Sequence, residues 1–142
     1  LVACALVLPV VGSSKNPVER PFKAAGIFTS DPVTETFLVL GNATHLGKIV
    51  FAGSFSFVSA TPAGLVTLHI QGTYTAANGD TIVVDCPNWV TQYDAEGNAL
   101  TSTGLVKING GTGRFAGATG SYVGNIYAGD TLTFTAEGTI TY

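Results

Sequence analysis

The stretch LVTLHIQGTYTAANGDTIVVDCPNWVTQY, residues 65–93, decides the fold. Over residues 68–74 every second residue is apolar, aromatic or Gly, and the residues between them are polar. That period of two is the pattern of a strand with one buried face. The triplet Asn78-Gly79-Asp80 is typical of a tight hairpin turn, so residues 81–93 predict the returning strand, interrupted at Pro87.

The same alternation and the same turn signals recur along the chain from Phe22 onward. They predict further strands over residues 33–41, 48–59, 99–110, 121–128 and 130–142. No stretch shows a helical period, and a Thr-rich composition with 18 Gly and no Met favours strands. The sequence therefore predicts an all-β fold, because short turns between seven or eight strands make an antiparallel meander.

An antiparallel meander must close or pack on a second sheet to hide its edges. We expect a single up-and-down β-barrel of about eight strands, with a sandwich as the alternative. The predicted organisation is an N-terminal apolar arm and linker at residues 1–21, followed by the barrel domain at residues 22–142. The apolar run Leu1 to Val11 is too short to span a membrane as a helix, so we expect no membrane span.

Charge excludes one class of partner. Charged residues make up 11% of the chain and the net charge is −3. Six scattered Lys and Arg cannot build a basic patch, so we expect no nucleic-acid partner.

Two glycine-containing segments carry a resemblance. GNATHLGK (41–48) and INGGTGRFAGATGSY (108–122) resemble segments of secreted bacterial proteins of the allene oxide cyclase and dirigent superfamily. The resemblance implies an eight-stranded antiparallel barrel over about residues 25–142, with a short turn or helical kink before the last hairpin and Phe115 tucked into a barrel mouth. Plant cyclases of that superfamily use a Glu in an apolar cavity. Here only Glu35 and Glu137 lie well inside predicted strands, and neither matches the family's local sequence.

Motifs for catalysis or metal binding are few. GGTGRFAG (110–117) lacks the strand–loop–helix context and the Lys-Ser/Thr of a phosphate loop, so a structural glycine hairpin is the favoured interpretation. His45 is either a general base or a side chain that orders its turn by bonding backbone, and His69 is either exposed or in a cross-strand contact. Two distant His without a third ligand make no metal site, and we expect no cofactor. The sequence favours a non-enzymatic role.

Cysteines and aromatic residues supply the remaining candidates. Cys4 and Cys86 form an even pair, which predicts a disulfide; free buried thiols are the alternative, and Cys86 as a nucleophile is a further one. Inward-facing aromatics predict either a filled core or an apolar ligand cavity. The cavity candidates are Phe55, Phe57, Tyr74, Trp89, Tyr122 and Phe134.

The N-terminal stretch LVACALVLPVVGSS (1–14) has three interpretations: the remnant of a secretory signal, a lipoprotein signal with Cys4 as the modified residue, or a strand of the mature protein. The stretch begins without Met or a basic segment, so we expect a processed, secreted chain at the cell surface or outside the cell. An apolar mature segment needs burial, and a neighbouring copy can provide it by strand addition. The predicted assembly residues are Leu1, Val2, Leu6, Val7, Leu8, Val10 and Val11.

Two functional hypotheses follow, and the sequence favours the first, with the second as the alternative. The first is a secreted structural barrel that self-assembles with other copies of itself, as a filament or another polymer, through the arm. The second is a small hydrophobic-ligand binder, or a cyclase or isomerase of the allene oxide cyclase type. The location of residues 1–11 and the presence of an interior cavity distinguish the two.

Overall fold

A computed structural model describes residues 16–142 of the 142-residue chain. The predictions that fall on residues 1–15, which include Cys4 and the assembly strand, lie outside these described residues.

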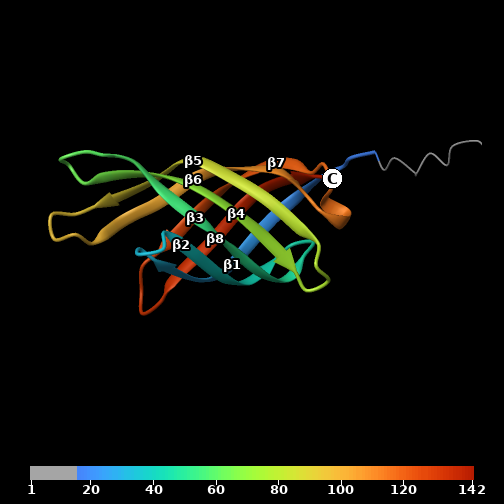
Figure 1. The fold of residues 1–142 in the computed structure, drawn as a ribbon, viewed down its shortest axis with the longest axis horizontal. Helices are drawn as coiled ribbons and strands as arrows, with labels where there is room; N and C mark the ends of the chain where they lie inside the picture. The colour runs from blue at the N-terminus through green and yellow to red at the C-terminus, as the bar shows by residue number, and fades with distance from the viewer. Residues whose placement is uncertain (1–15) are drawn as a thin grey trace, which may run out of the picture.

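The described chain is an antiparallel β-barrel with one short 3-10 helix, η1 (Gly113–Phe115), between its sixth and seventh strands (Figure 1). The eight strands are β1 (Glu19–Asp31), β2 (Thr36–Ala43), β3 (Gly47–Ala60), β4 (Leu65–Ala76), β5 (Thr81–Tyr93), β6 (Ala99–Gly111), β7 (Thr119–Tyr127) and β8 (Leu132–Thr141). Each strand pairs with the next along the chain, and β1 pairs with β8 to close the barrel. The predicted fold class is confirmed, and the sandwich alternative is excluded.

Strand boundaries differ from expectation mainly at the start of the barrel. β1 begins at Glu19, ahead of the predicted boundary at residue 22, and Pro21 lies opposite Thr139 within the β1–β8 ladder. A proline lacks an N–H, but its fixed φ is compatible with an extended strand. The predicted interruption at Pro87 is present, because the β5–β6 register shifts between Asp85 and Val90.

Side chains alternate between the inside and the outside of the barrel along each strand, and the inward ones form the core. On β4, residues 68, 70, 72 and 74 face inward, while the Thr-rich opposite face is turned outward, as the sequence predicts. At the end of the barrel that holds η1, the interior is packed with rings, and the rings of Phe51 and Tyr74 stack with centroids 3.9 Å apart. Phe115 of η1 is completely buried beneath this end, in agreement with the expectation that it tucks into the barrel. We call this the closed end.

The opposite end extends into a lip. The β2–β3 ladder ends at Ser54, whereas the β3–β4 ladder continues to Ala60; likewise the β6–β7 ladder ends at Thr103, whereas the β5–β6 ladder continues to Ala99. The β3–β4 and β5–β6 hairpins therefore project past the rest of the wall, at the left of Figure 1. This lip borders one side of the barrel mouth, at the end opposite the closed end.

Candidate functional site

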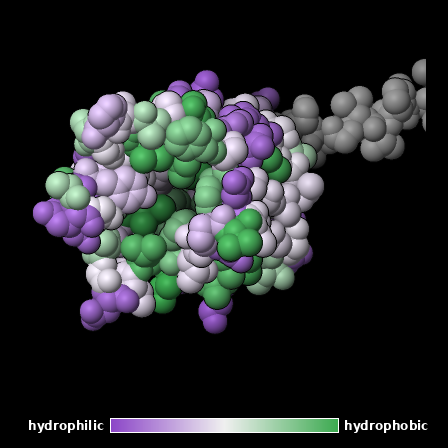
Figure 2. Space-filling view, turned by 60° about the vertical axis from the view of Figure 1, so that its left-hand side comes forward, coloured by the Kyte–Doolittle hydropathy of each residue, from purple (hydrophilic) through white to green (hydrophobic). Residues whose placement is uncertain are grey.

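The barrel mouth opens into a cavity of about 620 Å³. Figure 2 looks toward this end and shows a hollow with hydrophobic side chains inside it and hydrophilic groups around it. Ligand-binding cavities typically have volumes of roughly 300–1,000 Å³ with mainly apolar walls. The cavity is therefore large enough for one small molecule, and it is the candidate functional site.

All eight strands contribute residues to the cavity lining. Among the described residues, the lining contains no Asp, Glu, Lys, Arg or His. Its apolar and aromatic members are Phe28, Pro32, Phe37, Phe55, Leu68, Ile70, Trp89, Tyr93, Ala99, Leu100, Ile126, Tyr127, Ala128 and Leu132. Its polar members are Ser30, Thr91, Thr101, Ser102, Thr103 and Asn125. Such a wall recognises hydrocarbon surface and offers uncharged hydrogen-bonding groups.

Trp89 forms part of the cavity floor. Its side chain is 3% exposed, and it borders both the mouth cavity and a second, inner cavity of about 20 Å³. Two glycines on neighbouring strands make room for the indole: a Cβ at Gly104 would lie 2.7 Å from Cε3, and a Cβ at Gly124 would lie 2.8 Å from Cζ3. The indole Nε1 donates to Ser102 Oγ at 2.9 Å, which fixes the ring orientation.

Below this floor, the inner cavity has an apolar wall that includes Tyr122 and Phe134. A site of this size and polarity has few partners for water. Deeper still, the Tyr74 hydroxyl donates to the Tyr122 hydroxyl at 2.8 Å. Both phenols are buried, and burial raises the pKa of each, so the pair is neutral and forms a polar contact within the core.

The predicted cavity residues are divided between the two ends of the barrel. Phe55 and Trp89 line the mouth cavity, and Tyr122 and Phe134 line the inner one. Tyr74 lies in the packed closed end. Phe57 is 66% exposed on the lip, because β3 there extends beyond the barrel and a register shift follows Phe57.

Cys86 lies inside the barrel, where its side chain is completely buried and has no disulfide partner within residues 16–142. Burial raises the pKa of the Cys86 thiol, with a smaller contribution from the Asp85 charge. A protonated, enclosed thiol is a poor nucleophile. The predicted disulfide has its other half, Cys4, outside the described residues, and stays a prediction.

This burial predicts selective protection of one thiol. We expect iodoacetamide at neutral pH to alkylate Cys86 at least about a hundredfold more slowly in the native protein than in urea, since reaction requires opening of the barrel. Peptide mapping by mass spectrometry separates Cys86 from Cys4. Rapid native labelling of Cys86 would contradict the enclosed position.

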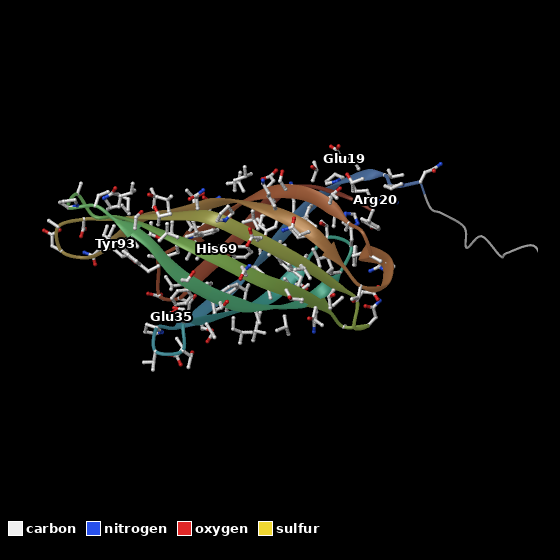
Figure 3. All side chains as sticks on the ribbon, turned by 45° about the horizontal axis from the view of Figure 1, so that its top comes forward. Glu19, Arg20, Glu35, His69 and Tyr93 are labelled. Atoms are coloured by element: carbon white, nitrogen blue, oxygen red, sulfur yellow. The ribbon has the colours of Figure 1, made fainter. Side chains whose placement is uncertain are left out.

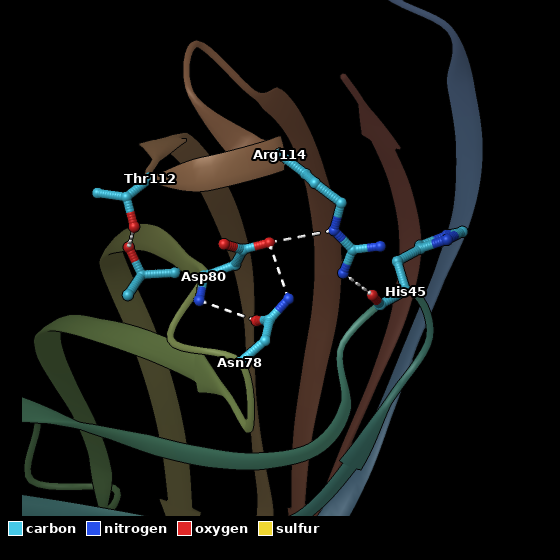
Figure 4. A network of polar contacts seen from close by, with 6 residues as sticks. His45, Asn78, Asp80, Thr112 and Arg114 are labelled. Carbon is cyan, nitrogen blue, oxygen red and sulfur yellow. Dashed lines mark hydrogen bonds and ion pairs between the residues drawn. The ribbon is translucent and has the colours of Figure 1, made fainter.

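His45 orders the closed end. It has φ 68°, its Nε2 lies 2.7 Å from the Pro21 carbonyl oxygen, and its own carbonyl accepts from Arg114 at 2.6 Å (Figure 4). Arg114 also donates to Asp80, at 3.1 Å. His45 therefore joins turns by bonding backbone, the structural alternative that the sequence left open.

The remaining candidate acids and bases lie outside the cavity. His69 Nε2 contacts Asp85 Oδ1 at 2.6 Å across the outer face of β4 and β5, which confirms the cross-strand alternative. Glu35 lies in the turn between β1 and β2 with φ 56°, and Glu137 faces outward, 3.7 Å from Lys23 Nζ. Neither carboxylate is placed to act on a molecule within the cavity.

Several cavity residues were not among the predicted ones, notably Phe28, Phe37, Ile70 and Ile126. The alternation on β4 predicted the inward orientation of Ile70, but orientation does not say whether an inward side chain packs against another or borders a void. That difference depends on which strands continue past the barrel wall.

Comparisons with protein-family models and with curated proteins find no match for this chain. The fold and the site define a closed eight-stranded barrel with an apolar cavity at one end. The relationship to the allene oxide cyclase and dirigent superfamily stays a prediction. Within residues 16–142 there is no helix long and apolar enough to cross a membrane, and no cluster of candidate metal ligands.

Proposed function

We propose that this protein binds a small apolar molecule in the mouth cavity. The observation that supports the proposal most strongly is the cavity itself, about 620 Å³ within a barrel whose other end is packed solid. A small barrel can fill its interior with side chains. Here the aromatic packing stops at Trp89, and the wall above it keeps a mainly apolar lining.

Burial of hydrocarbon surface provides the affinity. Each Å² of apolar surface removed from water contributes roughly 25 cal/mol, less the cost of immobilising the ligand. The aromatic side chains Phe28, Phe37 and Trp89 offer flat faces that pack against rings or chains. The described cavity wall holds no Asp, Glu, His, Lys, Arg or Cys side chain, which favours binding as the proposed function.

Self-assembly through residues 1–14 is the other hypothesis from the sequence. In the described barrel, β1 pairs with β8 over residues 19–28 and with β2 over residues 24–31, which closes the wall. Unpaired edges remain along residues 19–22 of β1 at the closed end, and along residues 56–60 of β3 and 99–102 of β6 on the lip. That hypothesis rests on residues outside the described part, and assembly, like secretion, stays a prediction.

A blocking substitution tests the binding proposal. Ser30 lines the cavity near the rim and is exposed, so Ser30→Phe places a ring in the cavity without removing core atoms. We expect it to weaken binding of N-phenyl-1-naphthylamine, an uncharged fluorescent probe, at least about tenfold. Titration with energy transfer from Trp89, the single Trp of the chain, measures the affinity.

The matched control is Thr29→Phe, which adds the same ring to the outward-facing neighbour on β1. Its probe affinity should equal that of the wild-type protein. Absence of saturable probe binding to the wild-type barrel, or equal affinity for both variants, would refute the mouth cavity as the binding site.

A further inference from the structure

The cavity wall contains one hydrogen-bonded chain. Trp89 Nε1 donates to Ser102 Oγ at 2.9 Å, and Ser102 Oγ lies 3.0 Å from Thr91 Oγ1. Thr91 is 6% exposed, and its hydroxyl lies close to the buried indole of Trp89 through Ser102. Both hydroxyl residues line the mouth cavity, above the floor that Trp89 forms.

This hydrogen-bonded chain of Trp89, Ser102 and Thr91 has one hydroxyl hydrogen that no protein group among the described residues accepts. Ser102 and Thr91 carry one hydroxyl hydrogen each, and the bond between them uses one of the two. Within residues 16–142, neither hydroxyl donates to any other protein group. Whichever way the pair is oriented, one O–H remains without a protein acceptor in a mainly apolar wall, where an unmade hydrogen bond is costly.

The rim of the mouth carries charge of one sign. Asp31 precedes the lining residue Pro32, Asp94 follows the lining residue Tyr93, and Asp130 lies between the lining residues Ala128 and Leu132. The turns at this end also hold Glu35 and Glu96, and they hold no Lys, Arg or His. In Figure 3, Glu35 and Tyr93 lie at the mouth end, whereas Arg20 lies at the opposite end.

We propose that the cavity takes an uncharged ligand with a single hydrogen-bond-accepting oxygen, of the class of long-chain ketones and alcohols, and rejects amphiphilic carboxylates. This inference rests on the proposed binding function and specifies its ligand class. The hydrocarbon part lies on the apolar floor at Trp89, and the oxygen accepts the spare hydrogen of Thr91 or Ser102. A carboxylate at that depth loses its hydration without meeting a cation, and it also faces the acidic rim.

Ligands that differ only in the head group test the charge preference. Calorimetric titration of the full chain at neutral pH compares 2-decanone, below its solubility limit, with decanoate, below its critical micelle concentration. We expect 2-decanone to bind at least about tenfold more tightly than decanoate, because an unpaired carboxylate in an uncharged wall is strongly disfavoured. Equal or tighter binding of decanoate would overturn the inference, whereas no binding of either probe would overturn the proposed function itself.

A thermodynamic cycle, in which both the ligand and the protein are changed, tests the proposed hydrogen bond from Thr91 or Ser102 to the ligand oxygen. The triple variant Trp89→Phe/Thr91→Val/Ser102→Ala replaces all three members of the hydrogen-bonded chain with apolar groups, so no side-chain donor is left without an acceptor. We expect the affinity ratio of 2-decanone to 1-chlorodecane, which lacks the oxygen, to fall about two- to tenfold in this variant.

Thr75→Val, on the outward face of β4, is the matched control and should keep the wild-type ratio. If the ratio of the two affinities is unchanged in the triple variant, with 1-chlorodecane still bound, the hydrogen-bonded chain does not select the ligand. Loss of all binding in the triple variant would also count against the inference, because it predicts that the hydrocarbon contribution persists.

Discussion

The substitution Gly124→Val is expected to lower the free energy of unfolding by about 3 kcal/mol, through overpacking and loss of one hydrogen bond. A Cβ at residue 124 would lie 2.8 Å from Cζ3 of Trp89 and 3.0 Å from its Cη2, and valine adds two further methyl groups. The indole cannot retreat toward β6, because Gly104 already lies against it. It must turn away from the floor and give up its bond to Ser102.

Denaturant unfolding at neutral pH measures this loss, and the emission of Trp89 reports the displaced ring. The control is Gly129→Ala, where the nearest atom, Thr131 O, would lie 3.5 Å from the new Cβ. That change should stay within about 0.5 kcal/mol of the wild-type stability. Equal stabilities of the two variants would show that the indole does not depend on the glycine.

The dependence of Trp89 on two glycines explains why the barrel is hollow at one end. At the closed end, the ring of Tyr74 contacts the rings of Phe22 and Phe51. Beside Trp89, the neighbouring strands β6 and β7 carry Gly104 and Gly124, so the indole occupies space that side chains would otherwise fill. The cavity above it remains because the lip extends past the last layer of packed rings.

Much of the barrel could be predicted from the sequence because its signals are local. Alternation over residues 65–76, the turn at Asn78-Gly79-Asp80 and the break at Pro87 each depend on a few neighbouring residues, and each is confirmed. The start of β1 was missed, since Pro21 reads locally as a linker residue while its pairing with β8 is set by a strand far along the chain.

The site was harder to predict, because a cavity depends on relations between strands. Phe55 and Phe57 are two residues apart, so the alternation places both on the same face of one strand. Phe55 lines the mouth, whereas Phe57 lies mostly exposed on the lip. Their difference arises where β2 stops pairing with β3, at Ser54. The hydrogen-bonded chain of Trp89, Ser102 and Thr91 likewise joins two strands through a register shift that no single segment encodes.

The largest pH effect is expected from the buried phenols of Tyr74 and Tyr122. Burial raises the pKa of both above the ordinary value of 10.0, which applies in the unfolded chain. Above pH 10 the unfolded state releases two protons that the folded state retains, so stability falls as pH rises. Each phenol contributes about 1.4 kcal/mol per pH unit, and the pair about 2.7 kcal/mol per unit.

The double variant Tyr74→Phe/Tyr122→Phe lacks this term. Near pH 7 it should be within about 1 kcal/mol of the wild type, because both partners of the 2.8 Å hydrogen bond become apolar together. Tyr74→Phe alone leaves the Tyr122 hydroxyl buried without its partner and should cost about 1–3 kcal/mol. This contrast between single and double variants is specific to a coupled pair.

At pH 11.5 the double variant should be more stable than the wild type. Between pH 7 and pH 11.5, the difference in the free energy of unfolding between the two proteins should change by about 4 kcal/mol in favour of the double variant. Urea unfolding of both proteins from pH 7 to 11.5 measures the divergence. The raised pKa of the Cys86 thiol adds a similar slope to both proteins and cancels from their difference. Parallel loss of stability in the two proteins above pH 10 would mean that the phenols ionise in the folded barrel, and that its closed end admits water.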